Sequence, residues 1–165
     1  MEKVDNKKDI EERERPREVV EVRVSSHPKM MRVLRAISEE IGSLAGLSEE
    51  QIIHLQIAID EASTNIIRHA YKFDTSKEFK LIFNLLEDRI EVVLEDNASP
   101  FQPESIESFD SANSAGGGLG VTLIHRAVDE VDYCVTRSGC NQLKLVKYLA
   151  GKEVNNREGI VATGK

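Results

Sequence analysis

The chain has 165 residues, enough for one ordinary domain with a hydrophobic core and too few for two. Its net charge of -7 argues against general nucleic-acid binding, because neutralising phosphates requires a basic surface. The sequence contains no run of about 18 apolar residues, so no membrane span is expected, and the N-terminus lacks the apolar segment of a secretory signal. The two cysteines, Cys134 and Cys140, have no metal-ligand spacing, and reduced thiols in a cytoplasmic protein are the simplest account of them.

Both ends of the chain have the composition of tails around one folded domain. Residues 1–17 are dense in charge and nearly free of apolar side chains, so they cannot bury enough surface to offset the entropy of ordering. Residues 151–165 are likewise polar. The sequence therefore predicts a single domain at residues 18–150.

The first half of this domain has the pattern of a strand followed by two helices. Val19–Val24 alternates between apolar and charged residues, which predicts a strand with one buried face. Ser26 is expected to cap the next helix, whose apolar residues recur at helical spacing until Gly46 ends it. Ser48 and Gln51 then form the pattern of a capping box, which predicts the start of a second helix.

The second half predicts two hairpins separated by a long loop and a helix. Phe79–Leu86 and Arg89–Glu95 form the first hairpin, and Val131–Thr136 and Leu143–Leu149 form the second. A glycine-rich segment before residue 121 leads into the helix between them. The order predicts an α+β fold, a two-layer sandwich with one mixed, mostly antiparallel sheet covered on one face by helices.

The second helix carries a polar stripe on an otherwise apolar surface, in the stretch from Leu55 to Tyr71. Glu61 and Asn65 are four residues apart, so both side chains can reach the same space. A helix that is apolar on most sides and carries such a pair suggests a buried helix beside a pocket. Taken alone, this helix is better explained as a core helix whose polar residues face water.

Two further segments have the chemistry of a nucleotide site. The run Gly116–Gly120 precedes a helix, where glycines allow close backbone approach and free N–H groups attract phosphate, although a flexible hinge explains the run equally well. Its spacing is neither that of a P-loop nor that of a dinucleotide-binding motif. Asp96 follows a strand, and its carboxylate could accept a hydrogen bond from an exocyclic amine such as that of adenine; alone, it is better explained as an ordinary turn residue.

The three segments in this order are more specific than any one of them. EASTN (61–65), DNASPF (96–101) and GGLGV (117–121) resemble the N, G1 and G2 boxes of the GHKL ATPase superfamily. The resemblance extends to His69-Ala70-Tyr71 and to Gly139-x-Asn141-x-Leu143, and it is closer to the bacterial anti-sigma-factor serine/threonine protein kinases. It covers about residues 18 to 149 and implies the Bergerat, histidine-kinase-like fold.

The resemblance implies ATP and Mg²⁺ as cofactors and assigns roles to the residues of the three boxes. Asn65 would offer its amide oxygen to Mg²⁺, a hard ion that prefers oxygen ligands. Glu61 would be the general base, and Asp96 would hold the adenine amine. The phosphates would be bound by the glycine-rich segment: Gly117, Gly118, Leu119 and Gly120.

The implied function is an anti-sigma factor that transfers a phosphoryl group from ATP to a serine of an anti-anti-sigma (STAS-type) partner and sequesters a sigma factor. The resemblance also implies a homodimer. One alternative is a non-catalytic nucleotide-binding switch that only sequesters a partner, which the presence of Glu61 argues against. The catalytic domain of a histidine kinase is a third reading, but the chain leaves no room for a phospho-accepting helical hairpin.

Two positions bear on how closely the resemblance can be followed. Ala98 stands where many family members have glycine, and it would strain the backbone if this position required a positive φ. Arg32 resembles an arginine that family members present to their protein partner, and a plain surface arginine is the alternative.

Overall fold

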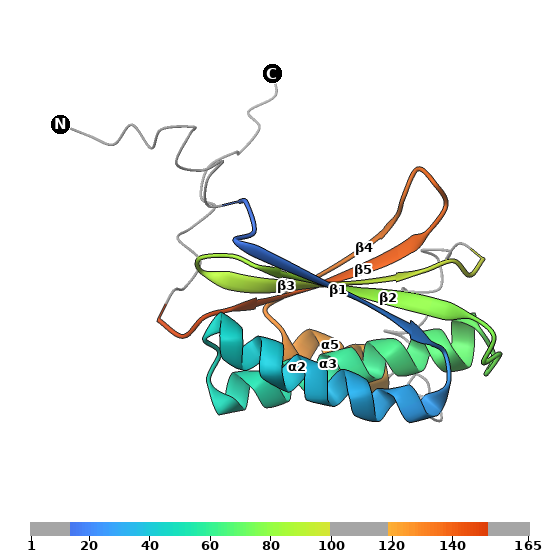
Figure 1. Ribbon diagram of the computed structural model, residues 1–165, viewed down its shortest axis with the longest axis horizontal. Helices are drawn as coiled ribbons and strands as arrows, with labels where there is room; N and C mark the ends of the chain where they lie inside the picture. The colour runs from blue at the N-terminus through green and yellow to red at the C-terminus, as the bar shows by residue number, and fades with distance from the viewer. Residues whose placement is uncertain (1–13, 100–118, 152–165) are drawn as a thin grey trace, which may run out of the picture.

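The computed structural model describes residues 14–99 and 119–151, which form one sheet with helices on a single face (Figure 1). A short 3-10 helix, η1 (Pro28–Met30), precedes α2, and a π-helix, η2 (Ile66–Ala70), continues α3. The described strands and α-helices are β1 (Glu18–Ser25), α2 (Met31–Ala45), α3 (Glu49–Asn65), β2 (Glu78–Leu85), β3 (Arg89–Asp96), α5 (Leu119–Ala127), β4 (Glu130–Val135) and β5 (Asn141–Tyr148).

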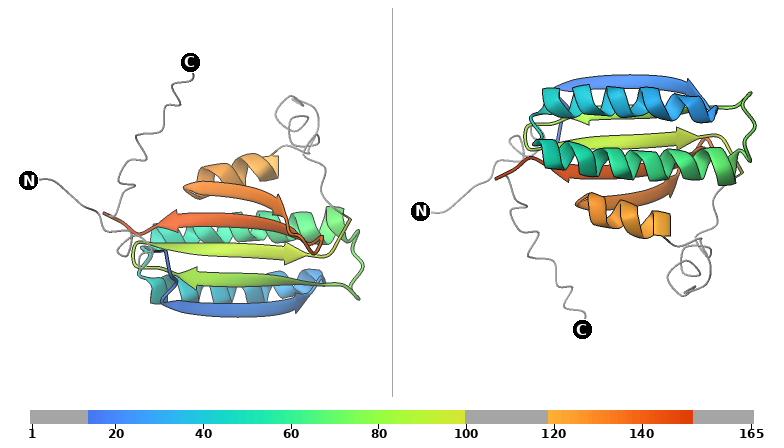
Figure 2. Two further views of the ribbon diagram at one scale, coloured as in Figure 1. Left: turned by 90° about the horizontal axis from the view of Figure 1, so that it is seen from above. Right: turned by 90° about the horizontal axis from the view of Figure 1, so that it is seen from below.

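The sheet has the strand order β1-β2-β3-β5-β4. All four pairings between its strands are antiparallel. Below the sheet, α3 lies between α2 and α5 and packs against both (Figure 2). The predicted two-layer α+β fold is confirmed, with a sheet that is antiparallel at every described pairing rather than mixed.

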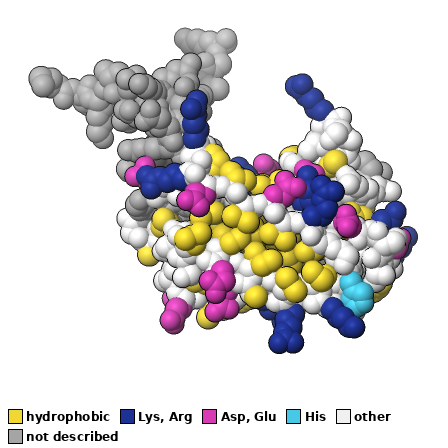
Figure 3. All heavy atoms as spheres, viewed as in Figure 1, with side chains coloured by type: hydrophobic (Ala, Val, Ile, Leu, Met, Phe, Trp, Pro, Cys, Tyr) yellow, Lys and Arg dark blue, Asp and Glu magenta, His cyan; other side chains and the backbone are white. Residues whose placement is uncertain are grey.

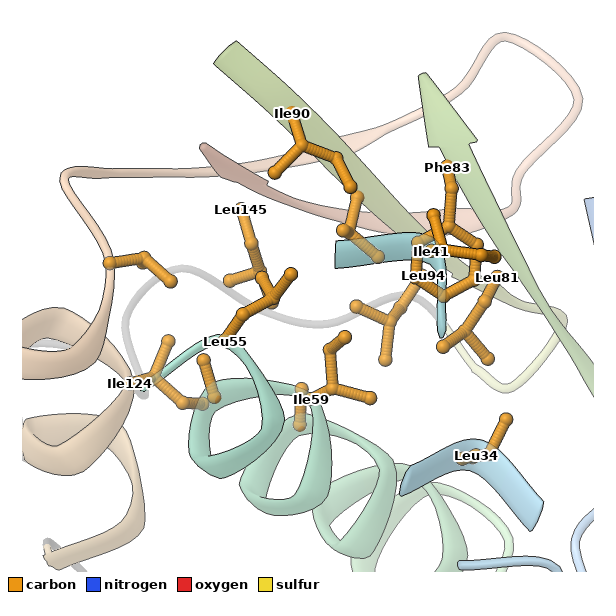
Figure 4. Packing of buried hydrophobic residues seen from close by; sticks show 14 of the residues in the cluster. Leu34, Ile41, Leu55, Ile59, Leu81, Phe83, Ile90, Leu94, Ile124 and Leu145 are labelled. Carbon is orange, nitrogen blue, oxygen red and sulfur yellow. The ribbon is translucent and has the colours of Figure 1, made fainter. Parts of the chain in front are cut away.

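The core lies between the two layers because strand residues alternate and helix residues recur on one side. In β2 the side chains of Phe79, Leu81 and Phe83 are fully buried and face the helices. Leu55 and Ile59, one turn apart on α3, point toward the sheet from below and belong to the same core cluster (Figure 4). Each such side chain contributes about 1.5–3 kcal/mol on burial, so this layer contact holds the fold together.

Local signals place the ends of α2 and α3 where the sequence predicts them. The hydroxyl of Ser48 accepts from the Gln51 N–H, and the Gln51 side chain accepts from the Ser48 N–H, so the predicted capping box is confirmed. Gly46 follows α2 with φ +89°, a left-handed conformation that glycine adopts without steric cost.

The predicted cap at Ser26 is wrong. The N-cap position belongs to His27, whose Nδ1 accepts a hydrogen bond from the Lys29 N–H at 3.1 Å. The Ser26 side chain is buried, and its hydroxyl donates to the carbonyl of Asp74. A distant loop therefore competes successfully for the side chain that local sequence assigned to the helix.

Most of the two predicted tails, residues 1–17 and 151–165, lies outside the described residues. The described residues before β1 are joined to the sheet at Arg17, whose N–H donates to the Leu85 carbonyl at 2.7 Å. Within residues 14–99 and 119–151, no helix is both long enough and apolar enough to cross a membrane.

Candidate functional site

Glu61 and Asn65 lie on the last two turns of α3, on the side that faces α5. Gly120 is the second residue of α5, and a Cβ built on it would lie 2.8 Å from Glu61 Oε2 and 3.9 Å from Asn65 Oδ1. The two oxygens therefore border the same point in space. The prediction that Glu61 and Asn65 reach the same space rests on their spacing of one helical turn, and the structure places them so. The start of α5 lies directly beside them.

Glycine at position 120 permits this arrangement. A side chain there would take the space that the Glu61 carboxylate occupies, since 2.8 Å is shorter than real Cβ contacts. The N–H groups in the first turn of an α-helix have no partners within the helix, and the positive end of the helix dipole lies there, so the start of α5 favours anions. Leu119 begins this turn and is exposed, whereas the predicted phosphate-binding residues Gly117 and Gly118 lie outside the described residues.

Asp96 ends β3 on the face of the sheet that is turned toward the helices. It is buried, with 8% of its surface exposed. Its Oδ1 accepts hydrogen bonds from the Ala98 N–H at 2.8 Å and from Asn141 Nδ2 at 3.0 Å. Both of these donors, from described residues, reach the same oxygen. The other carboxylate oxygen, Oδ2, has the chemistry to accept from a donor such as an exocyclic amine.

Ala98 causes no backbone strain. Among the described residues other than glycine, only Lys72 and Phe73 have a positive φ. The methyl group of Ala98 packs against the hydrophobic core. Position 98 does not require a positive φ, so alanine does not disturb the loop after Asp96.

Tyr71 links the end of the α3 segment to the loop that follows Asp96. Its hydroxyl donates to the Glu78 carbonyl at 2.8 Å and accepts from the Asn97 N–H at 3.0 Å. Burial is the main cause that raises the pKa of this hydroxyl, and the Asp96 charge adds a smaller rise, so Tyr71 stays protonated near neutral pH. The end of the segment that carries Glu61 and Asn65 is thereby joined to the loop that follows Asp96.

The π-helix η2 sets the position of Tyr71. The Tyr71 N–H donates to the Ile66 carbonyl at 2.9 Å, a five-residue step that adds one residue to the last turn. The chain then leaves through Lys72 and Phe73 with φ of 51° and 63°. Left-handed conformations at residues other than glycine cost free energy, so the fold holds this turn in place through its hydrogen bonds.

Three features of the site were not predicted: the tie through Tyr71, the contact between Gly120 and Glu61, and the bond from Asn141 to Asp96. The third contact follows from the pairing of β3 with β5, which places Asp96 directly opposite Asn141. The sequence indicated two hairpins but not that β3 and β5 are neighbours. The other two contacts join segments that local patterns do not relate.

The donor atoms fit a Mg²⁺ ion held mainly by a nucleotide. Within the described residues, no group of three or more His, Cys, Asp or Glu is positioned to hold a metal. Mg²⁺ commonly takes one or two protein oxygens and completes its coordination with water and phosphate. The Asn65 amide oxygen, close to the first turn of α5, has the chemistry for such a ligand.

Comparison with known families identifies the kind of domain that this geometry belongs to. The family model described as the histidine kinase-like ATPase domain matches residues 24–147, from β1 to β5. The chain belongs to this family. The matched range includes Glu61, Asn65, Asp96 and Gly120, and ATP is the nucleotide implied for the site.

Curated relatives with similar sequences are serine-protein kinases of bacilli. The serine-protein kinase RsbW of Bacillus subtilis is 30% identical over 145 residues, which cover 83% of this chain and 89% of the relative. RsbW of Bacillus licheniformis is 31% identical over 160 residues, covering 87% and 98% of the two chains. The predicted resemblance to the anti-sigma-factor kinases is confirmed at the level of the family.

A solved structure supports the fold. The RsbU and RsbW domains of Rv1364c from Mycobacterium tuberculosis match with a TM-score of 0.57 and 16% identity. The match covers 80% of this chain and 32% of that longer one. At this identity the likeness concerns the arrangement of helices and strands.

Proposed function

We propose that the protein is a Mg²⁺-dependent serine/threonine protein kinase that uses ATP and acts as an anti-sigma factor. The observation that carries this proposal is the meeting of Glu61 Oε2 and Asn65 Oδ1 beside Gly120 at the start of α5. Relatives over most of the chain bear the name serine-protein kinase. A carboxylate at this place is needed for transfer and has no evident use in a protein that only binds nucleotide.

Each residue has a defined part in the proposed reaction. Asn65 would hold the Mg²⁺ that neutralises phosphate charge, and the first turn of α5 would bind the phosphates together with Gly117, Gly118 and Gly120. The Glu61 carboxylate would take the proton of the acceptor serine. The serine oxygen would then form a bond to the γ-phosphorus as the bond to the bridging oxygen breaks, and ADP would leave.

Asp96 would select the base of the nucleotide. Its Oδ1 is engaged by Asn141 and by the Ala98 N–H. The carboxylate can therefore accept the adenine amine only through Oδ2, in an orientation set by its neighbours. A guanine carbonyl would present an acceptor to this acceptor, so we expect ATP to bind and GTP to bind poorly.

The proposed partners are an anti-anti-sigma protein of STAS type, which carries the acceptor serine, and a sigma factor that the kinase sequesters. We further propose a homodimer. Arg32 lies exposed on α2, where it is free to meet such a partner. The proposed place of action is the cytoplasm, where the free cysteines Cys134 and Cys140 would stay reduced.

The decisive experiment measures nucleotide binding and phosphoryl transfer separately. Calorimetric titration of Mg·ATP is expected to give saturable binding that Asn65→Ala weakens strongly. Transfer from labelled ATP to a STAS-type domain of the same organism is expected to fall by about 10²–10⁴-fold in Glu61→Ala, while ATP binding persists. Glu50→Ala, an exposed carboxylate on the first turn of α3, is the matched control and should leave both unchanged.

The outcomes separate the kinase from its main alternative. Binding without transfer to any serine-bearing partner would indicate a nucleotide-dependent switch that only sequesters its partner. Absence of binding by the folded chain would contradict both readings. Transfer that survives Glu61→Ala unchanged would refute the assignment of the general base.

A further inference from the structure

Three sides of α3 are in contact with other described elements, and the fourth is turned to solvent. Toward α2, Gln56 donates to the Arg35 carbonyl and Asp60 accepts from the Arg35 guanidinium. Leu55 is fully buried beneath the sheet, and Glu61 meets the start of α5. The fourth side belongs to the outer face of the helix layer, which the right-hand view of Figure 2 shows with α3 between α2 and α5.

Two isoleucines lie on this solvent-facing side. Ile53 and Ile57 are one turn apart, and they are 55% and 37% exposed. One further turn along the same line is Glu61, the proposed general base. Single exposed apolar residues are common, but here two of them form a continuous track that leads to the proposed reacting group. Such a track marks a surface that another molecule covers.

A polar and a basic side chain continue the line on the other side of Glu61. Thr64 follows Ile57 by seven residues, or two turns, and Arg68 of η2 follows Thr64 by four. Arg68 is exposed and forms no ion pair with any residue in the described ranges. Its guanidinium is therefore available to a carboxylate of another molecule. We call this set the outer strip: Ile53, Ile57, Thr64 and Arg68.

The position of Glu61 decides which molecule covers the outer strip. The proposed phosphate site lies on the α5 side of Glu61, beside Gly120, so the nucleotide leaves the strip uncovered. To lose its proton to Glu61, the acceptor serine has to bring its hydroxyl to within about 2.6–3.2 Å of the carboxylate. The chain that carries this serine therefore passes over the neighbouring surface of α3.

We infer that the serine-bearing segment of the protein substrate binds along the outer strip. A rise of about 1.5 Å per residue places Ile57 and Ile53 about 6 and 12 Å from Glu61 on one side, and Arg68 about 10 Å away on the other. The acceptor that fits has apolar side chains at these distances on one side of its serine and a carboxylate on the other. The inference rests on the proposed function, because it describes what the proposed kinase recognises in its substrate.

The two ends of the strip also fix the direction of the acceptor. In the reverse direction the carboxylate of the acceptor would be buried against Ile53, and apolar side chains would cover the Arg68 guanidinium. Both contacts would cost free energy, because each removes a charged group from water without giving it a partner. The strip therefore selects one direction by penalising the other.

A second apolar surface provides the control. Figure 3 shows hydrophobic side chains gathered in the middle of the face that carries β1 and α2. Leu44 of α2 is 68% exposed, more than either isoleucine of the outer strip. It follows Arg35, the residue that meets Asp60, by nine residues, which is about 13 Å along the helix axis. Changes at Leu44 therefore test exposed apolar area that lies away from the proposed base.

Steady-state transfer from labelled ATP to a STAS-type domain of the same organism tests the apolar end of the strip. Ile53→Ser and Ile57→Ser should each raise the KM for this domain roughly 3- to 15-fold, because each removes apolar area that the acceptor covers. The kcat should stay within about twofold, since these side chains take no part in the chemical step. Leu44→Ser should leave both constants unchanged.

Charge reversal tests the basic end. Arg68→Glu sets a carboxylate against that of the acceptor and should raise the KM roughly 10-fold at low salt, with a smaller effect at high salt. Calorimetry on the same variant should give the wild-type affinity for Mg·ATP, which separates a contact with the acceptor from one with the nucleotide. Arg137→Glu, exposed in the turn between β4 and β5, is the charge-matched control.

Cross-linking locates the acceptor independently of the kinetics. Ile53→Cys, in a chain with Cys134→Ser and Cys140→Ser, is labelled with a benzophenone maleimide. Irradiation should join it to the STAS-type domain, and digestion should find the link on the apolar side of the acceptor serine. Leu44→Cys, labelled in the same way, should give no link.

Three results would overturn the inference. These are an unchanged KM in both isoleucine variants, an equal rise in Leu44→Ser, or a link from position 44 instead of 53. A loss of ATP affinity in Arg68→Glu would assign Arg68 to the nucleotide and overturn the proposed direction. Transfer that is indifferent to the strip contradicts this inference alone, whereas a wild-type chain that binds Mg·ATP without any transfer contradicts the proposed kinase and the inference with it.

Discussion

Replacing Gly120 with alanine tests whether α3 and α5 form one catalytic site. The added Cβ would lie 2.8 Å from Glu61 Oε2 and 3.9 Å from Asn65 Oδ1. The first distance is a clash, and the second is an ordinary van der Waals contact. Glu61 must therefore move, while Asn65 can stay where it is. The substitution separates the proposed base from the proposed metal ligand.

The size of the effect follows from these distances. The carboxylate has to retreat from 2.8 Å to the 3.4 Å at which ordinary contact begins, about 0.6 Å further away. Misplacing a reacting group by about 1 Å can cost about 10²-fold, so transfer should fall by roughly 10- to 100-fold. The free energy of unfolding should stay constant or rise by up to about 1 kcal/mol, because alanine has a higher helix propensity than glycine.

The assay is phosphoryl transfer from labelled ATP, with calorimetry on the same samples. Calorimetry measures any change in ATP affinity separately from transfer, because Gly120 also belongs to the proposed phosphate-binding segment. Glu61→Gln provides the control, because Gly120→Ala should have little further effect once the base is absent. A full additional loss in that background, or unchanged transfer in Gly120→Ala alone, would refute the reasoning.

Three other predictions concern the surroundings of the site. Asn141→Ala removes the donor that orients Asp96, and calorimetry should show ATP affinity reduced about 10-fold, with Asn84→Ala on β2 unchanged. Tyr71→Phe leaves two backbone groups unpaired and should lower the free energy of unfolding by about 1–3 kcal/mol in urea titrations; a loss below about 0.5 kcal/mol would contradict the tie. The Lys80 ammonium lowers the pKa of Glu95 through a hydrogen bond, helped by the Gln142 amide. The contribution of this carboxylate to the free energy of unfolding is therefore complete above the pKa that Glu95 has in the unfolded chain, about 4.5. It is lost as the pH falls through the lower pKa of the folded state. Glu95→Gln should show a smaller loss of stability on acidification.

Features that depend on neighbours in the sequence were predictable. The capping box at Ser48 and Gln51 and the left-handed Gly46 are local geometry, and both were placed correctly. The spacing of Glu61 and Asn65 is also local, because one helical turn brings both side chains to the same side. The order of the three boxes then added the family, which none of these local signals carries.

Features that depend on distant partners were not predictable from the pattern. Ser26 has the side chain of a helix cap, yet its hydroxyl is used by the Asp74 carbonyl, 48 residues away. The π-helix Ile66–Ala70 has no distinct hydrophobic period, so the sequence indicated only that the helix reaches about Tyr71. In both places the tertiary contact decides between local alternatives of similar free energy.

The candidate site combines residues from both layers of the fold, so substitutions in the two layers should affect different steps. Glu61 and Asn65 belong to a helix, and their arrangement depends on α5 through Gly120. Asp96 belongs to the sheet, and its orientation depends on β5 through Asn141. Changes in the sheet should therefore act first on adenine binding, and changes between α3 and α5 should act first on transfer. The Tyr71 hydroxyl joins the segment after α3 to the loop after Asp96, so its loss should affect both adenine binding and transfer.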